Sequence, residues 1–196
     1  MTPGIDAWAA WHPRVMAARM AGFTAPWYVA GGWAIDLHLG YETRPHEDLE
    51  IALPDGDFGA LAALFPDCAF AVPRDGAVWP LSDEELRRSH QTWAWEPAAG
   101  VWRFDVFRER PDGDTWVCRR DTRIRLPYVD VIRHTPDGIP YLAPEIVLLF
   151  KAKGSRDKDV ADLERVLPRL APERRRWLAG ALALAHPDHA WRALLS

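Results

Sequence analysis

A short apolar run followed by a pair of glycines stands out near the start of the chain. Residues 27–30 (W-Y-V-A) are uniformly apolar, which predicts a short buried strand. Gly31 and Gly32 follow directly, and they predict a turn whose backbone can adopt positive φ and lie close to a ligand. The next residues predict one or two helical turns that end at Gly40. A glycine turn that opens a helix is suited to binding phosphate.

In the next apolar run, polar and apolar residues alternate. Leu49 and Ile51 share one face of a predicted strand, and His46, Asp48 and Glu50 share the other. Residues two apart on a strand have Cα atoms roughly 6.6 Å apart, so the two acids can converge on one or two divalent cations. Without a cation or a shared proton, the two charges would repel each other. The pair therefore predicts a metal site, although the same D-x-E pattern also occurs on solvated strand edges.

Hydrophobic periodicity and capping signals predict several further helices and strands. A stripe of large apolar residues at helical spacing predicts an amphipathic helix over residues 5–20. The other predicted helices cover residues 58–65, 82–90, 144–153, 159–167 and 172–195, the last one interrupted at 186–188. The predicted strands cover residues 27–30, 46–53, 69–72, 92–95, 101–109 and 115–120. Tight turns separate the last three strands and predict a three-stranded antiparallel meander.

Asp105 lies in the middle of the predicted strand 101–109 and is the candidate for a third carboxylate. Its neighbours Phe104 and Val106 are apolar, and an unpaired carboxylate in such a place would lose its hydration without compensation. Either a metal ion or a salt bridge, to Arg103 or to an arginine of a neighbouring strand, can supply the missing positive charge.

The order of these motifs resembles the nucleotidyltransferases of the polymerase-beta-like superfamily. It is most similar to the group that adenylylates lincosamide and aminoglycoside antibiotics. The similar segments are G-G-W-A-I-D, T-R-P-H-E-D-L-E-I, H-Q-T-W, P-E-I-V-L-L-F-K-A-K and R-D-K-D-V-A-D-L, which lie within residues 25–170. The resemblance implies an α+β nucleotidyltransferase fold, with a mixed, mostly antiparallel twisted sheet flanked by helices and followed by a C-terminal helical region.

The resemblance also implies a set of site residues. The implied catalytic and metal-binding residues are Asp48, Glu50 and Asp105. The implied nucleotide-binding residues are Gly31 and Gly32. Arg44 and His46, next to the acids, are candidates either to contact the nucleotide or to order Asp48, and Lys151 is a further candidate for the nucleotide. The glycines would hold the phosphates of a nucleoside triphosphate and the acids would bind Mg²⁺, two ions when the nucleotide is present. In the superfamily, the third acid also accepts or relays the proton of the attacking hydroxyl. Antibiotic-modifying members usually have aspartate where this chain has Glu50.

Basic residues add further candidates for anion binding. Three lysines, Lys151, Lys153 and Lys158, stand close together in a chain with twenty-one arginines. The first two lie about 200° apart on a helix and cannot both face one ligand. We expect Lys151 to contact phosphate because it ends an apolar helix face; Lys158 is the alternative, and so is a solvated helix end that favours cations. The basic residues 119–125 form either an edge strand protected by charge or a segment that contacts triphosphate or an anionic substrate group.

Length, charge and composition set the general class. With 196 residues, 48% of them hydrophobic, the chain can form a nucleotidyltransferase core over residues 1–140 and a helical subdomain over residues 141–196. The net charge of −4 argues against binding nucleic acid or an anionic membrane. Two distant cysteines indicate buried free thiols. Without a signal peptide or a long apolar run, we expect a cytoplasmic protein, monomeric or homodimeric.

These features together predict Mg²⁺-dependent transfer of a nucleoside monophosphate, expected to be AMP from ATP, to a hydroxyl of a small molecule. The resemblance implies an aminoglycoside- or lincosamide-like antibiotic as the acceptor. Two alternatives remain open. The acceptor is instead a hydroxyl side chain of a protein, or the chain is a nucleotide-binding sensor in which Glu50 no longer supports full turnover.

Overall fold

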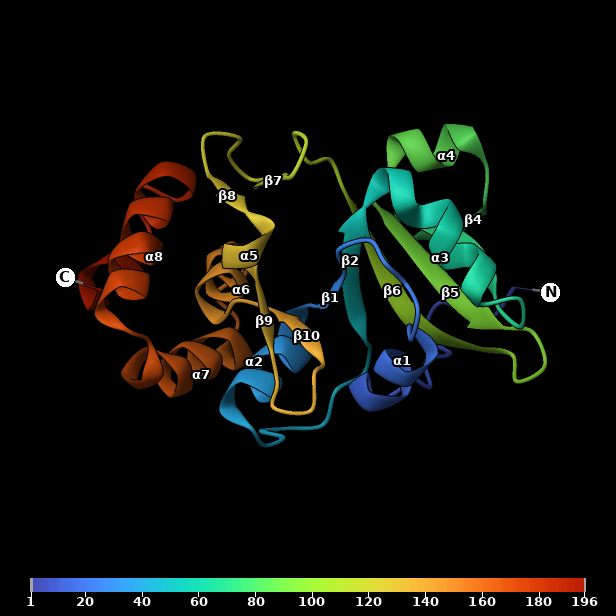
Figure 1. The fold of residues 1–196 in the computed structure, drawn as a ribbon, viewed down its shortest axis with the longest axis horizontal. Helices are drawn as coiled ribbons and strands as arrows, with labels where there is room; N and C mark the ends of the chain where they lie inside the picture. Colours follow the sequence, from blue (N-terminus) through green and yellow to red (C-terminus); the bar gives the residue numbers. More distant parts are fainter. Residues whose placement is uncertain (1, 196) are drawn as a thin grey trace.

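The computed structural model describes residues 2–195, in which an eight-stranded sheet is surrounded by helices (Figure 1). The strand order is β4-β3-β5-β6-β2-β1-β10-β9. Neighbours run antiparallel except for two parallel pairs, β1 with β10 and β2 with β6. The strands of this sheet are β1 (Tyr28–Val29), β2 (Glu50–Pro54), β3 (Ala69–Arg74), β4 (Ala77–Pro80), β5 (Gln91–Glu96), β6 (Val101–Glu109), β9 (Ile132–His134) and β10 (Pro140–Leu142). A second, two-stranded sheet consists of β7 (Thr115–Val117) and β8 (Arg125–Pro127).

The helices gather mainly at the two ends of the sheet. They are α1 (Pro13–Arg19), α2 (Gly31–Leu39), α3 (Phe58–Leu64), α4 (Asp83–Arg88), α5 (Tyr128–Val131), α6 (Pro144–Lys151), α7 (Asp157–Val166) and α8 (Pro172–Ala185), with 3₁₀ turns η1 (Asp55–Asp57), η2 (Leu167–Arg169) and η3 (Ala190–Leu194). In Figure 1, α6, α7 and α8 lie together at one end, and α3 and α4 lie at the other. The mixed, mostly antiparallel sheet with flanking helices confirms the predicted α+β fold class.

The helical C-terminal region packs directly on the rest of the protein. Helix α2 contacts both α6 and β10, and apolar side chains of α6, α7 and α8 belong to the same buried cluster as those of β1 and β2. The boundary predicted between residues 140 and 141 falls within β10, which is a strand of the large sheet. The division into two units stays a prediction. No helix between residues 2 and 195 is long and apolar enough to cross a lipid bilayer.

The pairing of β1, β2 and β6 positions the predicted site. In the parallel pair, Glu50 of β2 is in register with Asp105 of β6, so the two side chains leave the sheet on the same face. On the other edge of β2, the N–H of Ala30 donates to the carbonyl of Glu50 over 2.8 Å. The glycine turn after β1 therefore begins beside the first residue of β2.

The strand predicted over residues 46–53 begins only at Glu50, so the prediction was wrong for its first half. His46 and Asp48 lie in the preceding loop. The edge of β6 before Asp105 is instead paired with the N-terminal segment, since the N–H of Trp11 donates to the carbonyl of Arg103 and the N–H of Trp102 donates to the carbonyl of Ala7. The alternation of faces nevertheless extends into the loop, since Leu49 is fully buried and Asp48 is exposed.

The helix predicted over residues 5–20 was also too long. Helix α1 starts at Pro13, because proline favours the first helical turn and disfavours helical backbone in the residue before it. The earlier residues instead run along the sheet, where Trp8 bridges Trp102 in parallel fashion. The ring of Trp8 packs edge-on against Trp93, with ring centroids 5.0 Å apart. The apolar stripe reflected contact with the sheet rather than a helix face.

The predicted three-stranded meander was wrong in its third strand. Strands β5 and β6 form the expected antiparallel hairpin, but β7 pairs with β8 in the small sheet. The second edge of β6 is occupied by β2. Strand β6 carries buried residues on both faces, which suits a central strand, and its partner lies about 50 residues earlier in the sequence. A local hairpin pattern contains no signal for so distant a partner.

Candidate active site

A cleft of about 920 Å³ is lined by residues from β1, β2, β6, α2, α6 and the loops between them. Its volume is that of a pocket for a small-molecule ligand or cofactor. Most of the residues predicted from the sequence line it: Gly31, Gly32, Arg44, His46, Asp48, Glu50 and Lys151. The remaining one, Asp105, is only 3% exposed and lies beside Glu50 in the neighbouring strand.

Glu50 and Asp105 form a closely coupled pair of acids. Burial, followed by repulsion from Asp48, raises the pKa of Glu50 to about 7. Burial and then repulsion from Glu50 raise the pKa of Asp105 well above its usual value. One oxygen of Asp105, Oδ2, accepts a hydrogen bond from Gln91 over 2.7 Å, while the buried Oδ1 has no hydrogen-bond partner within residues 2–195. The Trp93 side chain lies near the same carboxyl and lowers its pKa. Without a bound ligand, this arrangement favours a proton on at least one of the two carboxyl groups.

The donor set of these acids fits a hard divalent cation. Asp48, Glu50 and Asp105 offer only carboxylate oxygens, and the unpaired Oδ1 of Asp105 is a buried acceptor that a cation would satisfy. Among the described residues, no three His, Cys, Asp or Glu side chains already form a metal-binding cluster. Mg²⁺ commonly binds only one or two carboxylates, together with substrate phosphates and water. The role of the three acids as metal ligands stays a prediction.

The raised pKa of Glu50 predicts a pH-dependent difference between the wild type and Glu50→Gln. Because the folded state holds the Glu50 proton more tightly than the unfolded state, the wild type loses stability as pH rises from about 4.5 to about 7. The substitution removes this cost, on the order of 3 kcal/mol when fully developed. We expect similar free energies of unfolding at pH 5, and a more stable variant at pH 8, in urea titrations with EDTA.

Comparing the two proteins at each pH is essential, because the pKa of Glu109 is also raised to about 7. The contribution of Glu109 to the pH dependence of stability is the same in the wild type and in Glu50→Gln, so it cancels in the comparison. A stability difference that does not change between pH 5 and pH 8 would show that burial and Asp48 do not raise the pKa of Glu50 in the folded protein.

The two glycines are required by close contacts as well as by backbone conformation. Gly31 begins α2 with φ +59°, and a Cβ atom there would lie 1.7 Å from Oε2 of Glu50. A Cβ on Gly32 would lie 2.4 Å from a terminal guanidinium nitrogen of Arg44 and 2.8 Å from Cε1 of His46. The turn thus lets the functional side chains approach the backbone at the start of a nine-residue helix, where free N–H groups can bind an anion.

His46 is held in place by a residue that sequence reasoning missed, Asp36 of α2. Its Oδ2 lies 2.6 Å from Nε2 of His46 and accepts from the N–H of Thr43 over 3.1 Å, while Oδ1 accepts from the Thr43 hydroxyl over 2.6 Å. The imidazole also stacks on Trp33, with ring centroids 4.3 Å apart. These contacts fix the loop that carries Asp48. The G-G-W-A-I-D segment contained Asp36, but only its glycines have an evident chemical role in the sequence.

Lys151 is engaged with carboxylates. Its ammonium group lies 2.9 Å from Oδ1 of Asp159 and 2.9 Å from Oδ2 of Asp162, both buried aspartates of α7. It lines the cleft and lowers the pKa of Glu50 through its charge. The contact of Lys151 with phosphate stays a prediction. A phosphate would have to compete with Asp159 and Asp162 for the ammonium group. Lys158, which also lines the cleft, has no ion pair within the described part of the chain.

Part of the chain matches known proteins in sequence. Residues 14–84 match the family described as aminoglycoside-2''-adenylyltransferase. Two relatives named 2''-aminoglycoside nucleotidyltransferase, from Klebsiella pneumoniae and Escherichia coli, are each 34% identical over 72 residues, which is 35% of this chain. The match spans 41% of the length of each relative.

Solved structures resemble the chain over most of its length. The antibiotic-resistance factor ANT(2'')-Ia superposes with a TM-score of 0.58 and 15% identity, over 86% of this chain and 88% of its own. The lincosamide antibiotic adenylyltransferase LnuA, bound to lincomycin, gives a TM-score of 0.54 and 15% identity, over 79% and 93%. The chain has the nucleotidyltransferase fold. The resemblance drawn from the sequence motifs is thereby confirmed.

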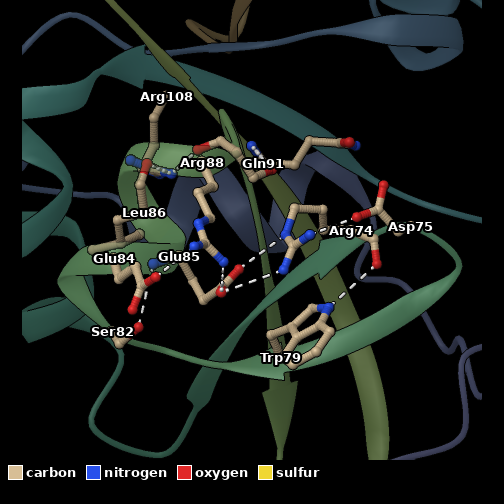
Figure 2. A network of polar contacts seen from close by, with 11 residues as sticks. Arg74, Asp75, Trp79, Ser82, Glu84, Glu85, Leu86, Arg88, Gln91 and Arg108 are labelled. Carbon is tan, nitrogen blue, oxygen red and sulfur yellow. Dashed lines mark hydrogen bonds and ion pairs between the residues drawn. The ribbon is translucent and has the colours of Figure 1, made fainter.

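Hydrogen bonds around α4 hold the segment that leads into β5 (Figure 2). Glu85 of α4 accepts a hydrogen bond from Arg74 over 3.0 Å, which ties the helix to the hairpin of β3 and β4. Arg108 of β6 donates to the carbonyl of Leu86 over 2.8 Å. These bonds fix the segment that leads to Gln91, the hydrogen-bond donor to the buried aspartate. Sequence reasoning gave this segment no role in the site.

Proposed function

We propose that this protein transfers a nucleoside monophosphate, with AMP as the expected group, from a nucleoside triphosphate to a hydroxyl of a small molecule in a Mg²⁺-dependent reaction. The observation that carries the proposal is the register of Glu50 with Asp105 on parallel strands, directly beside the glycine turn at the start of α2. Similarity to named nucleotidyltransferases over residues 14–84 supports it.

In this proposal, the glycine turn binds the phosphates and the acids bind the cation. Backbone N–H groups at Gly31 and Gly32 point from the start of α2 and would hold the β- and γ-phosphates. Asp48, Glu50 and Asp105 would hold the cation at the α-phosphate. When bound, Mg²⁺ supplies positive charge that offsets the repulsion of the acids and stabilises the attacking and leaving oxygens.

In the proposed reaction, the acceptor oxygen forms a bond to the α-phosphorus and the bond to the bridging oxygen breaks, so that pyrophosphate leaves in line. The proton of the acceptor hydroxyl passes to Asp105. That carboxyl can accept it in its ionised form, which a bound cation would favour; without a cation, burial and the neighbouring Glu50 raise its pKa and favour the protonated form. Gln91 keeps the side chain oriented through its hydrogen bond to Oδ2.

Calorimetric titration with a nonhydrolysable ATP analogue tests the nucleotide-binding part of the proposal. We expect binding that requires Mg²⁺ and that is lost in Asp48→Asn, because an amide is a weak ligand for a hard cation. Glu42→Gln is the matched control, since Glu42 is an exposed acid of the same loop that does not line the cleft. Equal binding in EDTA, or no heat with analogues of any of the four nucleotides, would contradict the proposal.

The acceptor belongs to the same proposal. The relatives are named for aminoglycoside and lincosamide substrates, which are small hydroxylated compounds. A screen of pyrophosphate release, with four nucleoside triphosphates against hydroxylated metabolites and antibiotics, would identify an acceptor for this chain. Intact-mass spectrometry of candidate proteins after incubation with ATP would detect transfer to protein hydroxyls instead.

A further inference from the structure

One wall of the cleft carries cationic side chains that lack carboxylate partners. Arg119 and Arg120 follow β7, line the cleft, and make no ion pair or hydrogen bond among the described residues. Of the other arginines that line the cleft, Arg88, Arg108 and Arg156 form ion pairs, with Glu84, Asp55 and Asp159. Arg44, Arg87 and Arg110 also line the cleft and have no ion pair within residues 2–195, but only Arg119 and Arg120 lie together against one aromatic ring. The positive charges of Arg119 and Arg120 are therefore available to a ligand.

These two guanidinium groups are held by aromatic rings rather than by acids. The Arg119 guanidinium lies 5.3 Å from the ring centroid of Phe150 and 5.8 Å from that of Phe107. The Arg120 guanidinium lies 5.8 Å from the same Phe150 ring, and its buried Nε has no hydrogen-bond partner in the described part of the chain. Partial desolvation in the cleft lowers the pKa of both, although the Arg119 residue as a whole is exposed, and the charge of Arg120 lowers that of Arg119 further. A bound anion would relieve both the repulsion and the missing hydrogen bond.

His90 completes this cationic wall. Its imidazole stacks on Phe107 with ring centroids 5.6 Å apart, and its Nε2 is buried without a partner. Burial and the charges of Arg119, Arg108 and Arg120 lower its pKa to about 4. At neutral pH, His90 is therefore uncharged and can donate or accept a hydrogen bond in the cleft.

The cationic wall begins on the opposite side of the acids from the glycine turn. Phe107 is two residues after Asp105 on β6, so both side chains leave the same face of the sheet. His90 precedes β5, the strand on the far side of β6, whereas the turn at Gly31 follows β1, the strand beyond β2. From Phe107 the wall extends through Arg119 and Arg120 to Phe150 of α6, and Arg119 is close enough to Glu50 for their charges to interact. In an in-line transfer, the acceptor enters opposite to the leaving pyrophosphate, which is the side on which His90 and Phe107 lie.

We propose that the acceptor carries an anionic group, such as a phosphate, a sulfate or a carboxylate, which Arg119 and Arg120 bind through their guanidinium groups. Guanidinium groups bind such oxyanions with paired, charge-assisted hydrogen bonds, and His90 adds one neutral contact. The unpaired arginines would repel a polycationic acceptor. This inference rests on the proposed function, because it assigns the wall to the acceptor and the glycine turn to the nucleotide.

Inorganic phosphate is the probe, titrated by NMR into the protein saturated with Mg²⁺ and a nonhydrolysable ATP analogue. With the nucleotide site filled, we expect phosphate to bind with a millimolar dissociation constant, and to bind at least about tenfold more weakly to the double variant Arg119→Gln/Arg120→Gln. Affinity for the nucleotide analogue should be unchanged. Arg123→Gln is the matched control, because Arg123 is in the same segment but is exposed and paired with Asp121.

Three results would overturn the inference. The first is no phosphate binding to the nucleotide-bound wild type, and the second is equal phosphate binding to the double variant. The third is a parallel loss of nucleotide affinity in the double variant, which would assign the wall to the triphosphate. If the wild type does not bind nucleotide at all, the proposed function fails. Phosphate titration of the free protein and the double variant then decides, on its own, whether the wall binds anions.

Discussion

Asp105→Asn is expected to lower kcat by about 10²- to 10⁴-fold without destabilising the folded protein. The amide cannot accept the hydroxyl proton and is a poor ligand for Mg²⁺. Its oxygen can still accept the hydrogen bond that Gln91 donates to Oδ2. The substitution also removes a buried negative charge that is repelled by Glu50, so the free energy of unfolding should stay the same or rise by about 1–2 kcal/mol.

Pyrophosphate release and urea denaturation, measured on the same preparation, would test both parts. Asp114→Asn is the matched control, since Asp114 lies in an exposed turn just after β6 and should change neither quantity. Full turnover by Asp105→Asn would remove the proposed role of this acid. Marked destabilisation would show instead that the carboxylate mainly supports the fold.

The glycine turn could be predicted from the sequence because its signals are local. Gly40 ends α2 in a left-handed conformation with φ +83°, as expected for a glycine at a helix end. Gly31 has φ +59°, which few other residues adopt without strain. A strand, a glycine turn and a capped helix each depend on residues only a few positions apart. Such patterns need no knowledge of the rest of the fold.

Contacts between segments far apart in the sequence could not be predicted in this way. The in-register pair of Glu50 and Asp105 depends on a parallel ladder between strands about 50 residues apart. The sequence of each strand alone predicts a strand but not its partner. The sequence favoured Asp105 because an aspartate between apolar neighbours needs compensation. It could not show that Gln91 is the residue that donates a hydrogen bond to Asp105. Nor could it show that Oδ1 of Asp105 lacks a hydrogen-bond partner among the described residues.

The cationic wall of Arg119, Arg120 and His90 also could not be predicted from the sequence. Arg119 and Arg120 can equally protect an exposed edge or bind an anion when only their sequence neighbours are known. The edge strand was wrong, since residues 119 and 120 lie in a turn after β7, and both side chains approach the ring of Phe150, about 30 residues later. Binding of an anion stays a prediction. Phe107 contacts both Arg119 and His90, so four aromatic contacts between distant segments bring these basic residues together.

Gly31→Ala is expected to cause the second large effect, because it combines backbone strain with a steric clash. An alanine at φ +59° costs about 1–2 kcal/mol. Its Cβ would also lie 1.7 Å from Oε2 of Glu50, so the carboxylate or the turn must move. We expect a loss of about 2–4 kcal/mol in the free energy of unfolding and at least about 100-fold weaker binding of the Mg²⁺–nucleotide complex.

Gly40→Ala separates the two causes. Gly40 also has positive φ, +83°, but a Cβ there would meet no atom within 4 Å. This control should cost only the backbone strain, about 1–2 kcal/mol, and leave nucleotide affinity unchanged. In a Glu50→Ala background the clash is absent, so Gly31→Ala/Glu50→Ala should be less stable than Glu50→Ala by the backbone strain alone, and it should not regain nucleotide binding. If Gly31→Ala and Gly40→Ala were equally stable and bound the nucleotide equally well, close approach of Glu50 to the turn would not be a requirement of this site.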